Sequence, residues 1–331
     1  MRTHAALLAL VVPLAACSGA GGVRSGPEVG SFSELPSGTA FLYVADRSFG
    51  RHPDELAAYG RSANGNAAPL RAVAGAKTRM EYAQAVALDS SRNEYVSSFS
   101  RITAYAPDAN GNTNPIREIA GSGTGLDVLG GIAVDAGAEI YVVNNRMHRS
   151  EVAVFGAGAT GDVPPLRSIS GDKTELNVPF GIALDYAGNA YVTNTGYPPS
   201  ITVYGPGADG DALPVARIAG ASTGLNQPEG IAVDGEGTIY VTDHPSKSVL
   251  IYAEGATGDA APVRIIAGAK TTLAYPWGLA VDAQNRIWVT DLAKPKHVAV
   301  FAATATGDAP PIRDLRGSST QLTDPLGVAV R

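Results

Sequence analysis

A five-residue phrase that recurs six times constrains the fold of this 331-residue chain. Each copy is a short apolar run, rich in Val and Ile, which favours a strand over a helix. The copies start 46 to 50 residues apart, a spacing typical of propellers and solenoids. They are Ala85–Asp89, Gly131–Asp135, Gly181–Asp185, Gly230–Asp234, Gly278–Asp282 and Gly327–Arg331.

Three further apolar runs follow the phrase in each repeat. The first contains Tyr-Val or Trp-Val, the second ends in an aromatic residue, and the third follows Pro. Four short strands with no helix between them predict an all-β, six-bladed β-propeller of four-stranded blades. The first strand, Phe41–Asp46, has no partner before it, and the last, Gly327–Arg331, has none after it. We expect these two strands to pair and close the ring, which removes exposed sheet edges.

The segment Pro228–Asp243 resembles the repeat of the NHL family of six-bladed β-propellers. Met147-His148-Arg149 is similar to that family's Asn-His-Arg segment, with Met in place of Asn. The resemblance extends over residues 40–331 and implies the fold. It leaves the function open, because such propellers include enzymes, sensors and protein-binding platforms.

The first 39 residues predict a signal peptide and a lipid anchor. Residues 1–16 have a basic start and a twelve-residue apolar run, which is typical of a signal peptide and too short to span a bilayer. The following Cys17 is the only cysteine, and Leu14–Cys17 resembles a bacterial lipobox. That resemblance implies a diacylglycerol group on the Cys17 sulfur. The alternative is a plain signal peptide with an incidental cysteine.

Residues 17–39 would then form the lipid-anchored cysteine and a flexible tether, because they are rich in Gly, Ser and Pro. This predicts an extracytoplasmic protein held at a bacterial membrane by its lipid. Ser18 is not the Asp of an inner-membrane retention signal. In a Gram-negative host we therefore expect the outer membrane, with the propeller facing the periplasm.

Charge excludes one class of partner. Removing Arg2 with the signal leaves 24 basic and 31 acidic residues, a net charge of −7. A general nucleic-acid partner would require a basic face. We expect no nucleic-acid binding.

Several recurring polar residues are interpreted as scaffold. An Asp closes five copies of the phrase just before a tight turn, where its side chain can bond to the turn backbone. Gly-Asp or Gly-Asn in each link to the fourth strand predicts a hairpin turn. Five arginines that follow a Pro on the fourth strand are interpreted as solvated or blade-bridging: Arg71, Arg117, Arg167, Arg264 and Arg313.

The candidate site consists of positions where the repeat varies. The residue before the first strand differs in every blade although its flanks are nearly constant: Gln84, Gly130, Phe180, Glu229, Trp277 and Leu326. A second set follows the Tyr-Val strand: Asp46, Ser98, Asn144, Asn194, Asp243 and Asp291. Both loops are expected at the mouth of the central channel. Apolar walls with a few polar groups predict a binding site there.

The leading hypothesis is a non-catalytic binding or scaffold module, monomeric and without a cofactor. Its partner would be a small molecule, a glycan or an envelope protein. The alternative is a gluconolactonase-like hydrolase or a propeller lyase with Ca²⁺ or Zn²⁺ held by Glu229, Asp243 and Asn194. The resemblance to such enzymes implies an early metal-binding Glu where this chain has Gln84. A zinc site would draw on His52, His148, His244 and His297, whose unequal offsets from the Tyr/Trp-Val pair favour ordinary loop residues.

The anchor hypothesis makes a direct prediction. Cys17→Ser should abolish incorporation of radiolabelled fatty acid and release the protein from the membrane fraction, because the chain has no other thiol on which the thioether could form. Membrane association that is unchanged in the variant would contradict the anchor.

Overall fold

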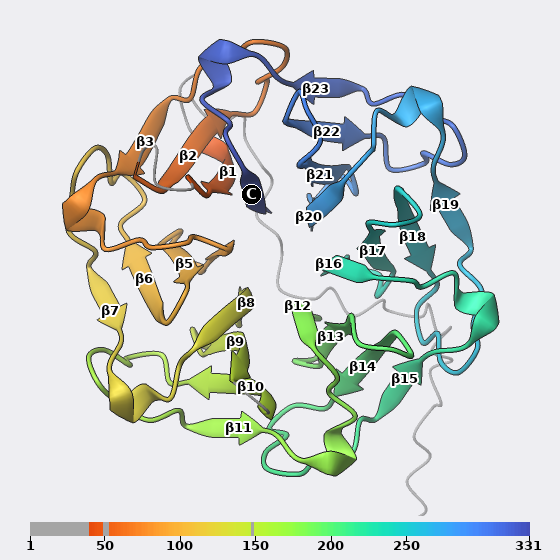
Figure 1. Cartoon of the computed structure of the whole chain (residues 1–331), viewed down its shortest axis with the longest axis horizontal. Helices are drawn as coiled ribbons and strands as arrows, with labels where there is room; N and C mark the ends of the chain where they lie inside the picture. Colours follow the sequence, from red (N-terminus) through yellow and green to blue (C-terminus); the bar gives the residue numbers. More distant parts are fainter. Residues whose placement is uncertain (1–39, 49–52, 147–148) are drawn as a thin grey trace, which may run out of the picture. The chain divides into compact units, whose positions relative to one another are not determined.

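The computed structural model describes residues 40–48, 53–146 and 149–331. In these ranges, 24 strands form six four-stranded antiparallel sheets, which lie around a central channel as the blades of a propeller (Figure 1). Blade 1 has the strand order β24-β1-β2-β3, and blades 2 to 6 follow in chain order from β4 to β23. The predicted fold is confirmed.

The strands fall into four concentric sets. The innermost are β4 (Ala85–Leu88), β8 (Val128–Val134), β12 (Pro179–Leu184), β16 (Pro228–Val233), β20 (Pro276–Val281) and β24 (Pro325–Val330). The second are β1 (Ala40–Asp46), β5 (Glu94–Ser98), β9 (Ile140–Arg146), β13 (Ala190–Asn194), β17 (Ile239–Asp243) and β21 (Ile287–Asp291).

The third set lies outside these: β2 (Glu55–Gly60), β6 (Arg101–Tyr105), β10 (Arg149–Phe155), β14 (Ser200–Tyr204), β18 (Ser248–Tyr252) and β22 (His297–Phe301). The outermost strands are β3 (Arg71–Ala74), β7 (Arg117–Ile119), β11 (Arg167–Ile169), β15 (Ala216–Ile218), β19 (Arg264–Ile266) and β23 (Arg313–Leu315). A short 3₁₀ turn follows each: η1 (Ala76–Thr78), η2 (Ser122–Thr124), η3 (Asp172–Thr174), η4 (Ala221–Thr223), η5 (Ala269–Thr271) and η6 (Ser318–Thr320). None of the helices in the described ranges has the length and apolarity to cross a membrane.

The ring closes as the sequence predicts. Strand β24 pairs antiparallel with β1, from Leu42 opposite Val330 to Asp46 opposite Pro325. The C-terminal strand begins two residues before the predicted Gly327, because a register shift lets Asp46 pair with Pro325. Blade 1 therefore contains strands from both ends of the propeller sequence.

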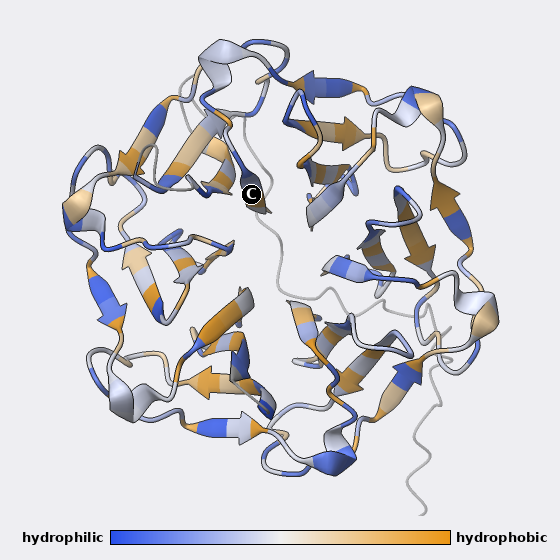
Figure 2. Cartoon of the chain, in the orientation of Figure 1, coloured by the Kyte–Doolittle hydropathy of each residue, from blue (hydrophilic) through white to orange (hydrophobic). Residues whose placement is uncertain are grey.

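The hydrophobic cores lie between neighbouring blades. One core, for example, joins Tyr240 and Ile251 of blade 5 to Ile287 and Phe301 of blade 6. The two middle strands of blade 5 are buried along their whole length, and Figure 2 shows one of them, β18, mostly in the colour of apolar residues. Each blade is thus covered on both faces, as the continuous apolar runs indicate.

Glycine sets the distance between the innermost strands. A Cβ added to Gly230 would lie 2.6 Å from the Trp277 carbonyl oxygen of the next blade. At Gly181 and Gly278 it would collide with the carbonyl oxygens of Glu229 and Leu326. The obstacle is backbone, which cannot rotate away as a side chain can. The recurring Gly after the variable position therefore has a steric cause in these blades, whereas blade 2 has Ala85 there.

The Gly-Asp and Gly-Asn links differ from the predicted hairpins. Each link crosses to the preceding blade and forms a parallel bridge with its outermost strand, as Gly111 does with Val73. The acid or amide then accepts a hydrogen bond from the 3₁₀ turn of that blade: Asp259 Oδ1 from the Ser222 amide at 2.7 Å, for example. Asn66 binds the Ser319 amide in the same way, so the series also joins blade 1 to blade 6. These residues connect blades.

The outer arginines also serve the scaffold. Arg71 pairs with Glu94 and donates to the Ala109 carbonyl of the next blade at 2.7 Å. Arg264 donates to the Ala303 carbonyl of its neighbour at 2.7 Å. Arg167 remains within its own blade, where it pairs with Glu139. These contacts agree with the interpretation of the outer arginines as structural.

The glycine contacts predict an unequal response to the smallest possible substitution. Gly278→Ala should destabilise the propeller by about 2–3 kcal/mol, because the added methyl group meets the fixed Leu326 carbonyl. Gly156→Ala is the matched control, since a Cβ there meets nothing within 4 Å. Urea denaturation of both variants measures the difference. Equal midpoints would contradict the steric account.

Candidate functional site

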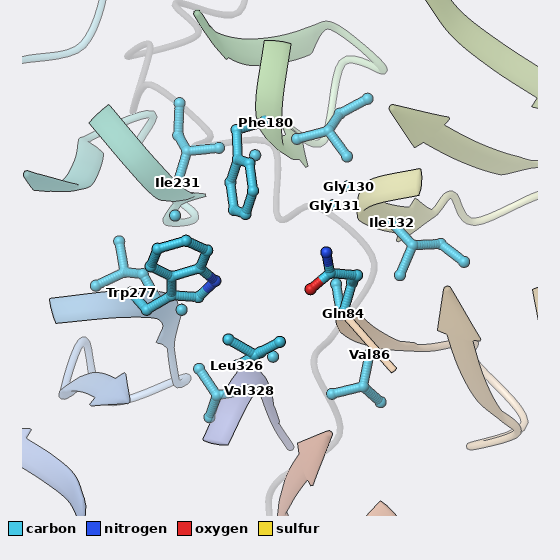
Figure 3. Close-up of a pocket in the computed structure, with 17 residues that line it drawn as sticks. Gln84, Val86, Gly130, Gly131, Ile132, Phe180, Ile231, Trp277, Leu326 and Val328 are labelled. Atoms are coloured by element: carbon cyan, nitrogen blue, oxygen red, sulfur yellow. The ribbon is translucent and has the colours of Figure 1, made fainter. Parts of the chain in front are cut away.

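The innermost strands enclose a small cavity of about 70 Å³ on the channel axis. Its wall consists of the variable side chains Gln84, Phe180, Trp277 and Leu326, with glycines and β-branched residues of the same strands. Figure 3 shows Phe180 and Trp277 on one side of the opening and Gln84 on the other. The structure thus brings together four of the six side chains that sequence variation selects, and Gly130 lines the same wall.

Aromatic rings extend from this cavity along one side. Phe180 meets Trp277 edge to face with ring centroids 5.0 Å apart. Trp277 in turn stacks with Tyr275 at 5.8 Å, and Tyr275 lies 3.7 Å from the His244 ring. Sequence reasoning missed Tyr275 as a site residue. It occupies another variable position, two residues before Trp277, where blades 2 to 4 have Tyr82, Val128 and Val178.

Gln84 provides a polar group opposite the rings. Its amide points into the opening in Figure 3. The Oε1 atom is buried and has no hydrogen-bond partner. An unpaired buried acceptor costs about 1–3 kcal/mol, and a ligand donor would recover that cost when the Gln84 side chain turns this oxygen toward the opening. The site can therefore recognise an apolar group next to a hydrogen-bond donor.

Hydroxyl groups fix the backbone that presents these side chains. The Thr242 hydroxyl donates to the Trp277 carbonyl of the next blade at 2.6 Å, and Thr290 donates to the Leu326 carbonyl at 2.9 Å. Thr193 holds the Glu229 carbonyl at 2.7 Å. The backbone at these positions belongs to the scaffold, whereas the type of side chain differs from blade to blade.

Glu229 lies in the channel wall and not in the lining of the cavity. It was predicted at the channel mouth, but it is 2% exposed and does not line the cavity. Its Oε1 accepts a hydrogen bond from Gln227 Nε2 at 3.0 Å. Gln227 stands where other blades have Val178 or Tyr275, and this local partner holds the carboxyl in the wall. Burial raises the pKa of Glu229 to about 7, with a further contribution from the Asp243 charge.

The second predicted set lies behind the channel wall and not at the channel mouth. Asn144, Asn194, Asp243 and Asp291 are fully buried and do not line the channel cavity. Each caps the loop that precedes its innermost strand. Asp243 Oδ2, for example, accepts hydrogen bonds from the Asn226 and Gln227 amides at 2.8 and 2.9 Å. The equivalent bonds from the Asp127, Asn177 and Ala274 amides are 2.8 to 3.0 Å long. These residues are part of the repeat's loop architecture.

The alternative metal ligands do not fit a cation site. Asp243 uses both oxygens, since Oδ1 accepts from Ser246, and Asn194 Oδ1 accepts from the Asn177 amide. Among the described residues, no three His, Cys, Asp or Glu side chains lie close enough to share a metal ion. His297 belongs to strand β22, where its ring bonds to Thr272 and the Pro295 carbonyl. His52, His148 and the anchor residue Cys17 lie outside the described residues.

Comparisons with known proteins agree with this architecture. The NHL repeat model matches residues 225–252 and 273–301. The chain is a six-bladed β-propeller in which these two segments, in blades 5 and 6, match the NHL repeat. A search of curated proteins finds no match.

Three solved structures are similar in fold. A nidogen/laminin complex superposes with a TM-score of 0.62 and 18% identity, covering 87% of this chain and 97% of the other. The periplasmic gluconolactonase of Pseudomonas aeruginosa superposes with a TM-score of 0.56 and 14% identity. The match covers 83% of this chain and 82% of the gluconolactonase. The PQQ-bound aldose sugar dehydrogenase of Streptomyces coelicolor superposes with a TM-score of 0.52 and 16% identity. The match covers 72% of this chain and 83% of the dehydrogenase. At these identities the likeness concerns the fold alone.

The buried Glu229 predicts a pH dependence of stability. Its pKa is raised in the folded chain, so the folded state holds a proton that the unfolded state releases near pH 4.5. The resulting stabilisation is complete below pH 4.5 and is lost as pH rises through about 7. Between pH 5 and 8, wild type should lose on the order of 2 kcal/mol relative to Glu229→Gln, in paired urea titrations. Parallel pH profiles for the two proteins would refute this.

Proposed function

We propose that the propeller is a non-catalytic binding module that recognises its ligand at the mouth of the central channel. We further propose that Cys17 carries the lipid that holds it at an extracytoplasmic membrane surface. The observation behind the first proposal is the aromatic pair Phe180–Trp277 opposite the unpartnered amide oxygen of Gln84. Such a site combines apolar area with one directional polar contact.

The position of these side chains supports a role in recognition. The fold needs glycine at the following residue and holds the Trp277 backbone through Thr242. It does not need an indole at position 277, because the six blades have six different residues there. Large aromatic residues that the scaffold does not require are typical of binding hot spots.

The carboxylates near the channel support binding over catalysis. A general base or metal ligand needs a free oxygen that faces the substrate. Asp243 and Asp291 bind loop amides, and Glu229 is buried in the wall. If the chain were a lactone hydrolase, like the gluconolactonase of similar fold, residues other than these three would have to act as general base or metal ligand.

A neutral apolar dye tests the channel-mouth site directly. N-phenyl-1-naphthylamine should bind with 1:1 stoichiometry, and Trp277→Ala should weaken binding at least about tenfold, because hot-spot truncations cost about 2 kcal/mol. Fluorescence titration gives the affinities. Tyr186→Ala is the matched control, since Tyr186 is 86% exposed and lies outside the channel cavity.

Two outcomes would count against the proposal. Dye affinity that is unchanged by Trp277→Ala, or reduced equally by Tyr186→Ala, would place the apolar site elsewhere. Circular dichroism of each variant confirms that the propeller is still folded.

A further inference from the structure

A second hollow lies beside the channel mouth, over blades 3 and 4. It measures about 920 Å³, and its wall includes Val128, Asn145, Arg149, Leu176, Val178 and Phe180. Phe180 also lines the channel cavity, so the two spaces adjoin across a single ring. Ligand sites are typically 300–1,000 Å³, which the hollow satisfies and the 70 Å³ channel cavity does not. The body of a ligand would therefore lie in the hollow, with one end at the channel.

The hollow has an apolar wall that faces solvent. Val128 is 40% exposed and Val178 is 54% exposed, although both are large aliphatic residues. Val178 also has φ of +50°, a left-handed conformation that a β-branched residue rarely adopts. Strain of this kind is typical of positions where the surrounding structure imposes a functional geometry. Neither burial nor backbone preference explains an aliphatic residue at this position.

Arg149 supplies a positive charge at the same hollow. Its Nη2 donates to Ser170 Oγ at 2.7 Å, which orients the guanidinium. Within the described ranges, no carboxylate lies at ion-pair distance from it, and most of its five N–H donors have no partner in the protein. Asp172, exposed on η3, is the acidic residue of the lining. An oriented arginine beside exposed valines is suited to an anion that has an apolar body.

We infer that the ligand of the proposed channel-mouth site is an amphipathic carboxylate. Its carboxylate would pair with Arg149, and its apolar chain would cover Val128 and Val178 before it reaches Phe180. The end of the chain would then enter the channel cavity between Phe180 and Trp277. This inference rests on the proposed function and adds the charge and shape of the ligand.

A matched pair of probes separates the charge from the chain. Dodecanoate and dodecanol have the same chain length and differ in the charged head. Isothermal titration below the micelle concentration should show that wild type binds dodecanoate more tightly than dodecanol. Arg149→Gln should reduce this preference by about two- to fivefold, because it removes the charge that pairs with the carboxylate at an exposed site. Dodecanol affinity should stay the same.

Two further variants sharpen the test. Asp172→Asn should tighten dodecanoate binding, because it removes the like charge in the lining. Lys173→Gln is the control for general electrostatics, since Lys173 is exposed on the same turn but does not line the hollow. An equal effect of Lys173→Gln and Arg149→Gln would overturn the assignment of Arg149.

Failure of this inference differs from failure of the proposed function. If wild type binds neither dodecanoate nor dodecanol, or if Arg149→Gln leaves their ratio unchanged, the carboxylate assignment is wrong. The neutral dye and Trp277→Ala still decide the channel-mouth site in that case. Loss of dye binding with an intact dodecanoate preference would instead leave the hollow as a site separate from the channel.

Discussion

Backbone contact between the innermost strands is the constraint on which this propeller depends. Glycine at five of the six contact positions lets backbone atoms of the next blade lie close to where a Cβ would stand, and Ala85 occupies the sixth. The narrow channel, its 70 Å³ cavity and the convergence of side chains from different blades follow from this approach. A wider ring would separate Phe180 from Trp277, whose centroids are now 5.0 Å apart.

The polar residues around this ring divide into two kinds. Most of those that recur, such as Thr242 and Asp243, make hydrogen bonds to backbone groups of their own or the next blade, with Ser98 as an exception. Those that occur once, such as Gln84 and Arg149, retain atoms that no protein group satisfies. The Gln84 oxygen is buried, where an unpaired polar group is costly, whereas Arg149 is exposed and keeps its free donors in solvent. Both stand beside apolar walls, and we take these walls as the surface that a ligand would cover.

Much of the fold and part of the candidate site could be predicted from the sequence, because residues that recur in every repeat are those that the blade structure requires. Strand order, ring closure and the channel positions of Phe180 and Trp277 follow from register alone. Register could not reveal that Gln227 holds Glu229 in the wall, because this depends on one local side-chain partner. Nor could it show that Asn194 faces a loop amide, or that the Gly-Asp links cross to another blade, because both are contacts between segments distant in sequence.

The central claim is that the channel mouth receives a ligand, and a single-tryptophan protein tests it most directly. Trp288 is buried and bonds to Asp282. Blades 2, 4 and 5 have tyrosine at that position, bonded to the equivalent Asp, so Trp288→Tyr should preserve the fold. Trp277 then becomes the sole source of indole emission. Saturating dodecanoate should shift that emission to shorter wavelength with 1:1 stoichiometry. An emission spectrum that does not change while dodecanoate binds would show that the ligand lies elsewhere.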